Sequence, residues 1–312
     1  MIEVLEPGTL TSVQTPYGRP GWRHLGVPVG GAADVWSARL ANRLVGNPDD
    51  AALIEVTLTG PSLHFETSST VGVAGSRFDL ILNGLPLPMH GARPVRAGST
   101  LRIGKGAGAR CYVAVGGGIE VPAVLGSAAT DLRSGFGGHE GRALQVGDRL
   151  PFGHASDRLR QWSGAGAGSD AIRIIAVGQE GGAQALSHGS WTVSEMADRT
   201  GVRIEGRTFS LAGGEVASMG IPIGAIQIPP DGRPIIMLAD RPVTGGYPVP
   251  ACVIGADVGR VAQLRPGDSL RLAAVSAEDA RHLLREMEDR LAALEDIAAS
   301  TDDEPGWAGA LE

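Results

Sequence analysis

Short apolar runs broken by glycine and proline dominate this chain. Four such runs lie at 2–5, 10–13, 54–65 and 71–82. Their length and their imperfect alternation with polar residues predict β-strands. The dipeptide Asn83-Gly84 then indicates a tight hairpin turn. Residues 100–103 and 111–115 predict a further hairpin, with the glycine-rich stretch 104–109 as its loop.

One early stretch has helical rather than strand spacing. Within residues 32–45, Trp36, Leu40 and Leu44 recur every four positions and form one apolar stripe. Gly46 follows as a stop signal. We therefore expect a helix that packs by one face.

Residues 276–300 predict a second, longer helix. Ser276 can cap its first turn, with Asp279 three positions on, which is the spacing of a capping box. The apolar stripe of this helix consists of Leu283, Leu284, Met287, Leu291, Leu294 and Ile297. Such a stripe can pack on the chain's own core or bind a partner, and we favour packing within the chain. We expect the acidic tail after Thr301 to be disordered.

A buried hairpin followed by a polar loop gives the first candidate site. Residues 225–228 and 235–238 are apolar, and Pro230-Asp231-Gly232 between them is typical of a turn. Functional residues favour loops that a rigid scaffold holds. The candidate residues of this hairpin and loop are Gln227, Asp240, Arg241, Thr244, Gly245, Gly246 and Tyr247.

A second candidate site is the glycine-rich loop 126–142. Its polar residues are Asp131, Arg133, His139, Glu140 and Arg142. A histidine beside a carboxylate suits acid–base chemistry, and arginine can hold a carboxylate or phosphate. Gly137 and Gly138 allow backbone amides to approach an oxyanion. The loop also fits a structural role, held by an Arg133–Asp131 pair. Both interpretations stay open.

Asp198 and Arg199 offer a third, weaker candidate. The two residues are adjacent and lie in a polar stretch. They can pair as a structural corner, or they can contact a ligand. The sequence does not decide between these two roles.

Composition and charge narrow the function classes. The formal net charge is −7, which argues against a nucleic-acid partner. No apolar run is long enough to cross a membrane, and no secretory signal pattern opens the sequence, so we expect a cytoplasmic protein. Two cysteines and scattered histidines give no disulfide framework and no metal-ligand spacing. Lys105 is the only lysine.

The sequence predicts two β domains. We place the first at 1–153, a linker at 154–170 that is rich in glycine, serine and alanine, and the second domain at 171–275. The amphipathic helix and acidic tail occupy 276–312. A faint repeat supports two related units, because residues 54–65 resemble 202–211.

Several motifs in order resemble one protein family. Residues 30–48 (GGAADVWSARLANRLVGNP), residues 113–127 (VAVGGGIEVPAVLGS) with the following GFGGHEGR, and the run 224–248 resemble the biotin-dependent carboxyltransferase, or allophanate hydrolase subunit 2, family. The likeness extends over residues 1 to about 275.

The resemblance implies a fold, partners and a co-substrate. The fold it implies is mainly β, with two tandem cyclophilin-like β-barrel domains and a few helices. The partner it implies is a smaller cyclophilin-like protein, such as the B subunit of 5-oxoprolinase, allophanate hydrolase subunit 1 or a KipI-like protein, with a possible A subunit as well. ATP would be a co-substrate, whose binding we do not assign to this chain. Because the sequence has no biotin-attachment lysine, biotin would bind only as a substrate that is not covalently attached to this chain.

The resemblance also implies an activity and residue roles. A stand-alone chain of this length is most similar to the C subunit of 5-oxoprolinase, which implies ATP-dependent hydrolysis of 5-oxo-L-proline to L-glutamate. Arg241 or Arg133 would hold the substrate carboxylate, while Asp240 or the His139–Glu140 pair would transfer protons. The alternatives are a carboxyltransferase component of the urea carboxylase or allophanate hydrolase type, and a regulatory protein that antagonises a KipI-like partner.

The substrate-binding set that the resemblance implies contains Arg133, Arg241, Thr244, Tyr247 and Gln227. Its phosphate or oxyanion contacts are Gly137, Gly138, Gly245 and Gly246. Two departures from the family pattern leave the substrate open. Pro242-Val243 precede Thr244 where a Gln-Thr pair is expected, and Ala128-Ala129 replace an Arg-Ser pair.

Overall fold

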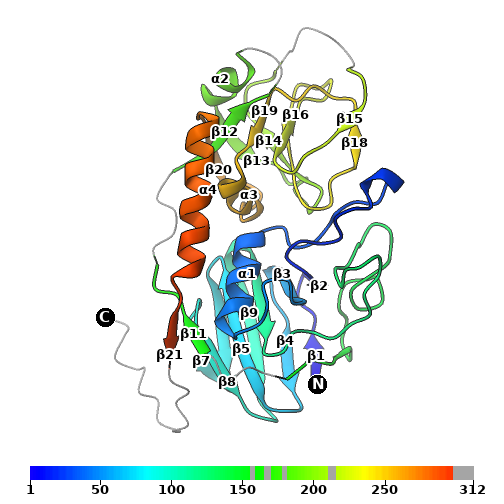
Figure 1. Ribbon diagram of the computed structural model, residues 1–312, viewed down its shortest axis with the longest axis vertical. Helices are drawn as coiled ribbons and strands as arrows, with labels where there is room; N and C mark the ends of the chain where they lie inside the picture. Colours follow the sequence, from blue (N-terminus) through cyan, green and yellow to red (C-terminus); the bar gives the residue numbers. More distant parts are fainter. Residues whose placement is uncertain (155–158, 165–169, 178–180, 210–215, 298–312) are drawn as a thin grey trace.

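Two β units follow one another along the longest axis of the molecule (Figure 1). The structure, a computed structural model, describes residues 1–154, 159–164, 170–177, 181–209 and 216–297. The predicted acidic tail lies outside these residues. Among the described residues, no helix is long and apolar enough to cross a membrane.

The first unit is a ten-stranded sheet around one apolar core. Its strands are β1 (Ile2–Glu6), β2 (Leu10–Gln14), β3 (Leu53–Thr59), β4 (Ser62–Phe65), β5 (Ser69–Gly75), β6 (Phe78–Leu82), β7 (Leu85–Pro86), β8 (Ala92–Val95), β9 (Thr100–Val115) and β10 (Arg149–Leu150). The main order is β10-β1-β4-β9-β3-β2, with β5 and β6 also paired to β9. The predicted Asn83-Gly84 turn joins β6 to β7, and both residues have positive φ.

Residues 100–115 form one continuous strand, β9, so the predicted hairpin with a loop at 104–109 is wrong. The first part of β9 pairs with β4 and β6, and the last part with β3 and β5. A Cβ atom at Gly106 would lie 2.4 Å from the Phe78 ring, and one at Gly108 would lie 2.1 Å from Ser76 Oγ. These glycines therefore allow close packing against neighbouring chain segments and do not form a turn.

The second unit is a closed seven-stranded barrel, β12-β19-β16-β17-β14-β13-β20. These strands are β12 (Ala171–Ala176), β13 (Ser190–Val193), β14 (Gly201–Glu205), β16 (Ala225–Gln227), β17 (Ile235–Met237), β19 (Ala251–Val253) and β20 (Ser269–Ala274). The short strands β15 (Met219–Gly220) and β18 (Thr244–Gly245) pair beside the barrel. The hairpin predicted from residues 225–228 and 235–238 is confirmed, because β16 and β17 pair antiparallel with Ile226 opposite Ile236.

The mainly β fold class is confirmed, with the second unit a closed barrel and the first a half-barrel. Few helices accompany the strands. They are η1 (Arg23–Leu25), α1 (Val35–Leu44), α2 (Gly182–Ser187), α3 (Gly255–Ala262) and α4 (Ala277–Ala292). Asp34 caps α1 through Ser37, and the predicted Ser276–Asp279 capping box opens α4.

The second predicted helix is shorter than the 276–300 expected. Helix α4 ends at Ala292, and β21 (Glu295–Ile297) follows and pairs antiparallel with β11 (Leu159–Gln161). Backbone pairing with β11 thus replaces a last helical turn. Strand β11 lies in the predicted linker 154–170, of which 155–158 and 165–169 fall outside the described residues. The proposed domain limits stay a prediction.

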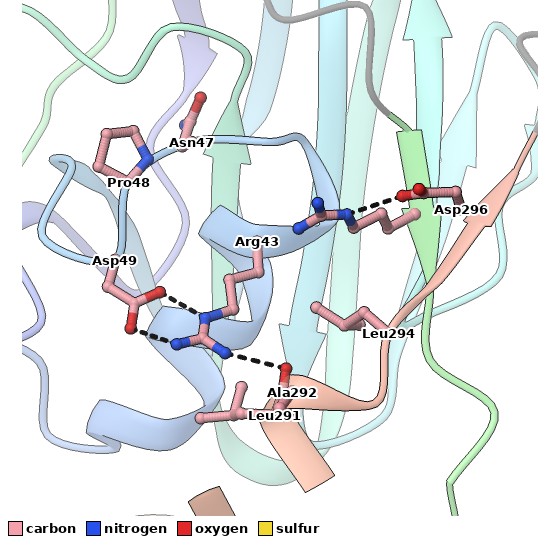
Figure 2. Close-up of a pocket in the computed structure, with 9 residues that line it drawn as sticks. Arg43, Asn47, Pro48, Asp49, Leu291, Ala292, Leu294 and Asp296 are labelled. Carbon is pink, nitrogen blue, oxygen red and sulfur yellow. Dashed lines mark hydrogen bonds and ion pairs between the residues drawn. The ribbon is translucent and has the colours of Figure 1, made fainter. Parts of the chain in front are cut away.

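Helix α4 leaves the second unit and packs on α1 of the first (Figure 1). Arg39 binds both Glu288 carboxylate oxygens, at 2.5 and 2.8 Å, and Trp36 Nε1 donates to the Met287 carbonyl oxygen. Figure 2 shows Arg43 between the Asp49 carboxylate and the carbonyl of Leu291, beside a cavity of about 320 Å³. The helix therefore fastens the two units together, as the prediction of packing within the chain requires.

We expect Leu291→Ala to lower the free energy of unfolding by about 2–4 kcal/mol, because Leu291 is fully buried among the α1 side chains. Urea denaturation followed by tryptophan fluorescence measures this change. Leu284→Ala on the same helix is the matched control, since Leu284 is 40% exposed, and its change should stay below about 1 kcal/mol. Equal losses in the two variants would contradict this account of the α4 contact.

Candidate functional site between the two units

Arg199 of the second unit lies between two carboxylates from different units. Its Nε and Nη2 donate to Asp240 at 2.8 and 2.9 Å, and its Nη1 donates to Glu55 of β3. Nη2 also donates to the Gly31 carbonyl oxygen at 2.6 Å. The Arg199 and Glu55 side chains are 5% and 1% exposed, so this ion pair is sealed from solvent.

The two carboxylates of this bridge differ in their surroundings. Glu55 accepts hydrogen bonds from Ala33 N and from Tyr112 Oη, each at 2.9 Å. Burial alone would raise the pKa of Glu55, but the Arg199 and Arg110 guanidiniums overcome it and hold that pKa below its ordinary value. For Asp240, burial outweighs Arg199 and raises the pKa. Asp240 is therefore the member of the bridge better suited to carry a proton.

Arg19 brings a second buried cation beside this bridge. It is 1% exposed, its Nη2 donates to the Ala129 carbonyl oxygen, and its guanidinium lies 4.6 Å from the centre of the Phe136 ring. Its Nε and Nη1 are buried and have no hydrogen-bond partner among the described residues. Burial lowers its pKa, against the attraction of Asp131 and Asp240. Buried donors without partners call for an explanation, and a bound anion supplies one.

Two glycines shape the space around Arg19. A Cβ at Gly30 would lie 3.5 Å from Arg19 Nη1 and 3.8 Å from Asp240 Oδ1, so Gly30 lies within van der Waals reach of both side chains. A Cβ at Gly137 would lie 2.7 Å from Arg19 Nη2. Asp131 adds a buried Oδ2 without a partner among the described residues. Its Oδ1 accepts the backbone amides of its own loop.

We call Arg19, Glu55, Asp131, Arg199 and Asp240 the interdomain cluster. Its members come from both units, and the unused hydrogen-bonding atoms belong to Arg19 and Asp131. A guanidinium with free N–H groups can hold a carboxylate, and a carboxyl group with a raised pKa can carry a proton. The cluster therefore suits chemistry on a small, anionic substrate.

Asp131 and Gly137 of the loop 126–142 reach these contacts, whereas the other predicted residues of that loop make their contacts elsewhere. His139 Nε2 lies 3.3 Å from Asp148 Oδ1, and Glu140 binds Arg142 at 2.5 Å, so both belong to an ion-pair network at the loop base. Arg133 is exposed, and its amide, not its guanidinium, bonds Asp131. Gly137 approaches Arg19 of the cluster, whereas Gly138 packs against Thr130. The proposed roles of His139, Glu140 and Arg133 stay predictions.

The other predicted residues beyond Asp240 line the β15–β18 side of the barrel. Arg241 is 9% exposed and donates to the carbonyl oxygens of Ile221 and Leu238. Thr244 and Tyr247 are exposed, the latter by 42%. Gln227 is buried, and its Nε2 has no partner among the described residues.

The two glycines of this loop have different contacts. A Cβ at Gly245 would lie 2.7 Å from Gln227 Nε2. The Gly246 carbonyl oxygen accepts from Val216 N. The roles assigned to the β15–β18 residues also stay predictions.

Sequence reasoning missed Arg19 and Glu55 and left the role of Arg199 open between a structural pair with Asp198 and a ligand contact. The structural pair is not formed, because Asp198 accepts from the backbone amides of Thr200 and Gly201 while Arg199 binds Glu55 of the other unit. Glu55 did leave a signal, since a carboxylate between apolar neighbours in a buried strand needs a partner. Arg19 lies between Gly18 and Pro20, and this local sequence gives no signal that the side chain is buried.

A separate apolar cavity of about 600 Å³ lies between α1, α3 and α4, with Trp36, Trp162, Leu284 and Met287 in its wall. None of the predicted site residues lines it. Among its charged residues, Arg39 is paired with Asp49 and Glu288. Because Arg19 and Asp131 of the interdomain cluster have buried polar atoms without partners among the described residues, we take the cluster as the candidate site. Among the described residues, no group of three histidine, cysteine or acidic side chains could hold a metal ion.

Known proteins share this architecture. The chain is 36% identical over 299 residues to the C subunit of 5-oxoprolinase from Haemophilus influenzae, covering 92% of this chain and 96% of that protein. It is 35% identical to the C subunit of 5-oxoprolinase from Escherichia coli, covering 90% and 93%. It is also 34% identical to urea amidolyase of Saccharomyces cerevisiae, covering 90% of this chain but 17% of that one.

Solved structures agree with the fold. The crystal structure of the Kluyveromyces lactis urea amidolyase superposes with a TM-score of 0.86 at 30% identity, over 93% of this chain. This chain spans only 20% of that protein. Residues 25–274 match the family described as carboxyltransferase domain, subdomain A and B. The chain therefore belongs to this carboxyltransferase-domain family.

Proposed function

We propose that this protein is a subunit of a 5-oxoprolinase that opens the ring amide of 5-oxo-L-proline to give L-glutamate, with ATP as co-substrate. One observation carries the proposal. The chain matches the C subunit of 5-oxoprolinase along 96% and 93% of two such proteins, whereas it matches urea amidolyase along 17%. A chain that corresponds to a whole subunit of one enzyme is best explained by that enzyme.

The interdomain cluster fits the chemistry of this substrate. 5-Oxoproline carries one carboxylate, which can accept hydrogen bonds from the unpaired Nε and Nη1 of Arg19. Hydrolysis adds a hydroxyl group to the ring carbonyl carbon and a proton to the ring nitrogen. Asp240, whose pKa is raised by burial, is the group we assign to that proton transfer. The cluster thus supplies both recognition and acid–base chemistry.

In this proposal the protein works with other subunits. The relatives are named as subunits, which supports a complex, and we propose that a small cyclophilin-like protein is the partner. We leave the site of ATP binding unassigned within the complex. Ring opening is to be assayed with all subunits present, as glutamate formed from 5-oxoproline and ATP.

Carboxyl transfer is the second candidate function. The family match and the TM-score of 0.86 to a urea amidolyase favour it, because those enzymes contain this domain. Carboxylation of free biotin or of urea by the assembled complex would support it. Glutamate formation without carboxylation of biotin or urea supports the 5-oxoprolinase function instead.

We expect Asp240→Asn to lower kcat for glutamate formation by about 10²-fold or more, because the amide cannot transfer the proton. Asp79→Asn, at an exposed position of β6, is the matched control and should keep the wild-type rate. Size-exclusion chromatography must show that each variant assembles. An assembled Asp240→Asn complex with wild-type kcat would rule out this role.

We expect Arg19→Lys to raise KM for 5-oxoproline by about tenfold or more with a smaller change in kcat, because lysine keeps the charge but loses the paired N–H groups. Steady-state kinetics at saturating ATP measure both constants. Arg233→Lys, an exposed arginine of the second unit, is the control. If Arg133→Lys raises KM and Arg19→Lys does not, the carboxylate binds at the loop arginine instead.

A further inference from the structure

Two arginines from different units meet at one backbone carbonyl group. Arg23 of η1 donates from Nη2 to the Ile221 oxygen at 2.9 Å and to the Val243 oxygen at 3.1 Å. Arg241 donates from Nε to the same Ile221 oxygen, also at 2.9 Å. The two guanidiniums are therefore neighbours beside β15 and β18.

Neither guanidinium is paired with an acid among the described residues. Their hydrogen-bond partners are the neutral carbonyl oxygens of Ile221, Leu238 and Val243. Burial, followed by the positive charge of Arg23, lowers the pKa of Arg241 to about 10. Two like charges held this close in a partly buried place oppose each other, and an anion between them removes the conflict.

Three other arginines of this protein show a contrast. Arg39 binds Glu288, Arg173 binds Asp257, and Arg199 binds Glu55 and Asp240. Each of these cations has a carboxylate within the chain. The Arg23–Arg241 pair differs from these three because its described hydrogen-bond partners are only carbonyl oxygens, which leaves room for a counter-charge from a bound anion.

Unused donors remain on both side chains. Arg23 Nε and Nη1 and Arg241 Nη2 make no hydrogen bond to the described residues. Arg23 is half-buried, so solvent reaches this place. Gly220 of β15 places no side chain beside the two guanidiniums. A Cβ atom at this position would lie 3.6 Å from Arg23 Nη2.

We propose that Arg23 and Arg241 form an oxyanion subsite, separate from the interdomain cluster, that binds the carboxylate or phosphate group of a small molecule. Each arginine offers N–H groups in the fixed planar arrangement that matches such oxygens. Because Arg23 belongs to the first unit and Arg241 to the second, the bound oxyanion joins the two. The inference goes beyond the proposed function and does not depend on turnover.

Isothermal titration calorimetry of the full chain at constant ionic strength tests the subsite. The probes are inorganic phosphate, ATP and 5-oxoproline, titrated separately up to about 10 mM, a range that detects millimolar binding. We expect at least one of them to bind. Phosphate or ATP binding that Arg23→Gln weakens assigns the subsite to phosphoryl groups. Binding of 5-oxoproline that Arg23→Gln weakens and Arg19→Lys does not assigns it to carboxylates.

The variants decide whether the arginine pair is responsible. Arg23→Gln and Arg241→Gln should each weaken the binding about tenfold or more, the effect of losing one charge-assisted hydrogen bond. Arg233→Gln, at an exposed arginine, should leave it unchanged. Arg23→Gln alone is decisive if Arg241→Gln does not fold, because Arg23 is the more exposed of the two.

Two results would overturn the subsite. One is the absence of binding by every probe to the wild-type chain, and the other is unchanged binding in Arg23→Gln. Failure of the proposed function looks different, since an assembled complex would then form no glutamate while this chain still binds the oxyanion. The reverse case is a complex that forms glutamate while its Arg23→Gln chain binds every probe as the wild type does. That result rules out the subsite and leaves the proposed function standing.

Discussion

The placement of Arg199 between Glu55 and Asp240 is the constraint on which the candidate site depends. Burying a guanidinium that is 5% exposed is costly unless acids neutralise it, and here one acid comes from each unit. Loss of one partner of a buried ion pair commonly costs about 3–5 kcal/mol, because the remaining charge stays without compensation. The two units are therefore fixed in one relative position by charge as well as by apolar packing.

That fixed position determines the chemistry available between the units. Gly31, whose carbonyl oxygen accepts from Arg199, follows Gly30, and Gly30 faces both Arg19 and Asp240. The same bridge therefore holds the loop that brings Arg19 to the boundary. Asp240 has a double role in this arrangement, since it neutralises Arg199 and has a pKa that burial raises.

Local signals in the sequence predicted local structure well. The turn at Pro230-Asp231-Gly232 and the Ser276–Asp279 capping box depend on neighbouring residues, and both are present. Strand β9 was missed because a glycine needed for close packing looks the same in sequence as a glycine needed for a turn. The partners of the cluster were missed for another reason, since Glu55 and Arg199 are 144 positions apart and nothing local records their contact.

The path of α4 has a consequence for the order in which the protein is completed. The helix lies near the end of the described chain, yet Leu291 fills a cluster whose other members come largely from α1 and the strands around it. Domains generally fold in order from the N-terminus as the ribosome releases them. The apolar cluster of the first unit therefore stays without Leu291 until α4 has been synthesised. A chain that lacks α4 would leave the side chains that Leu291 covers exposed to solvent.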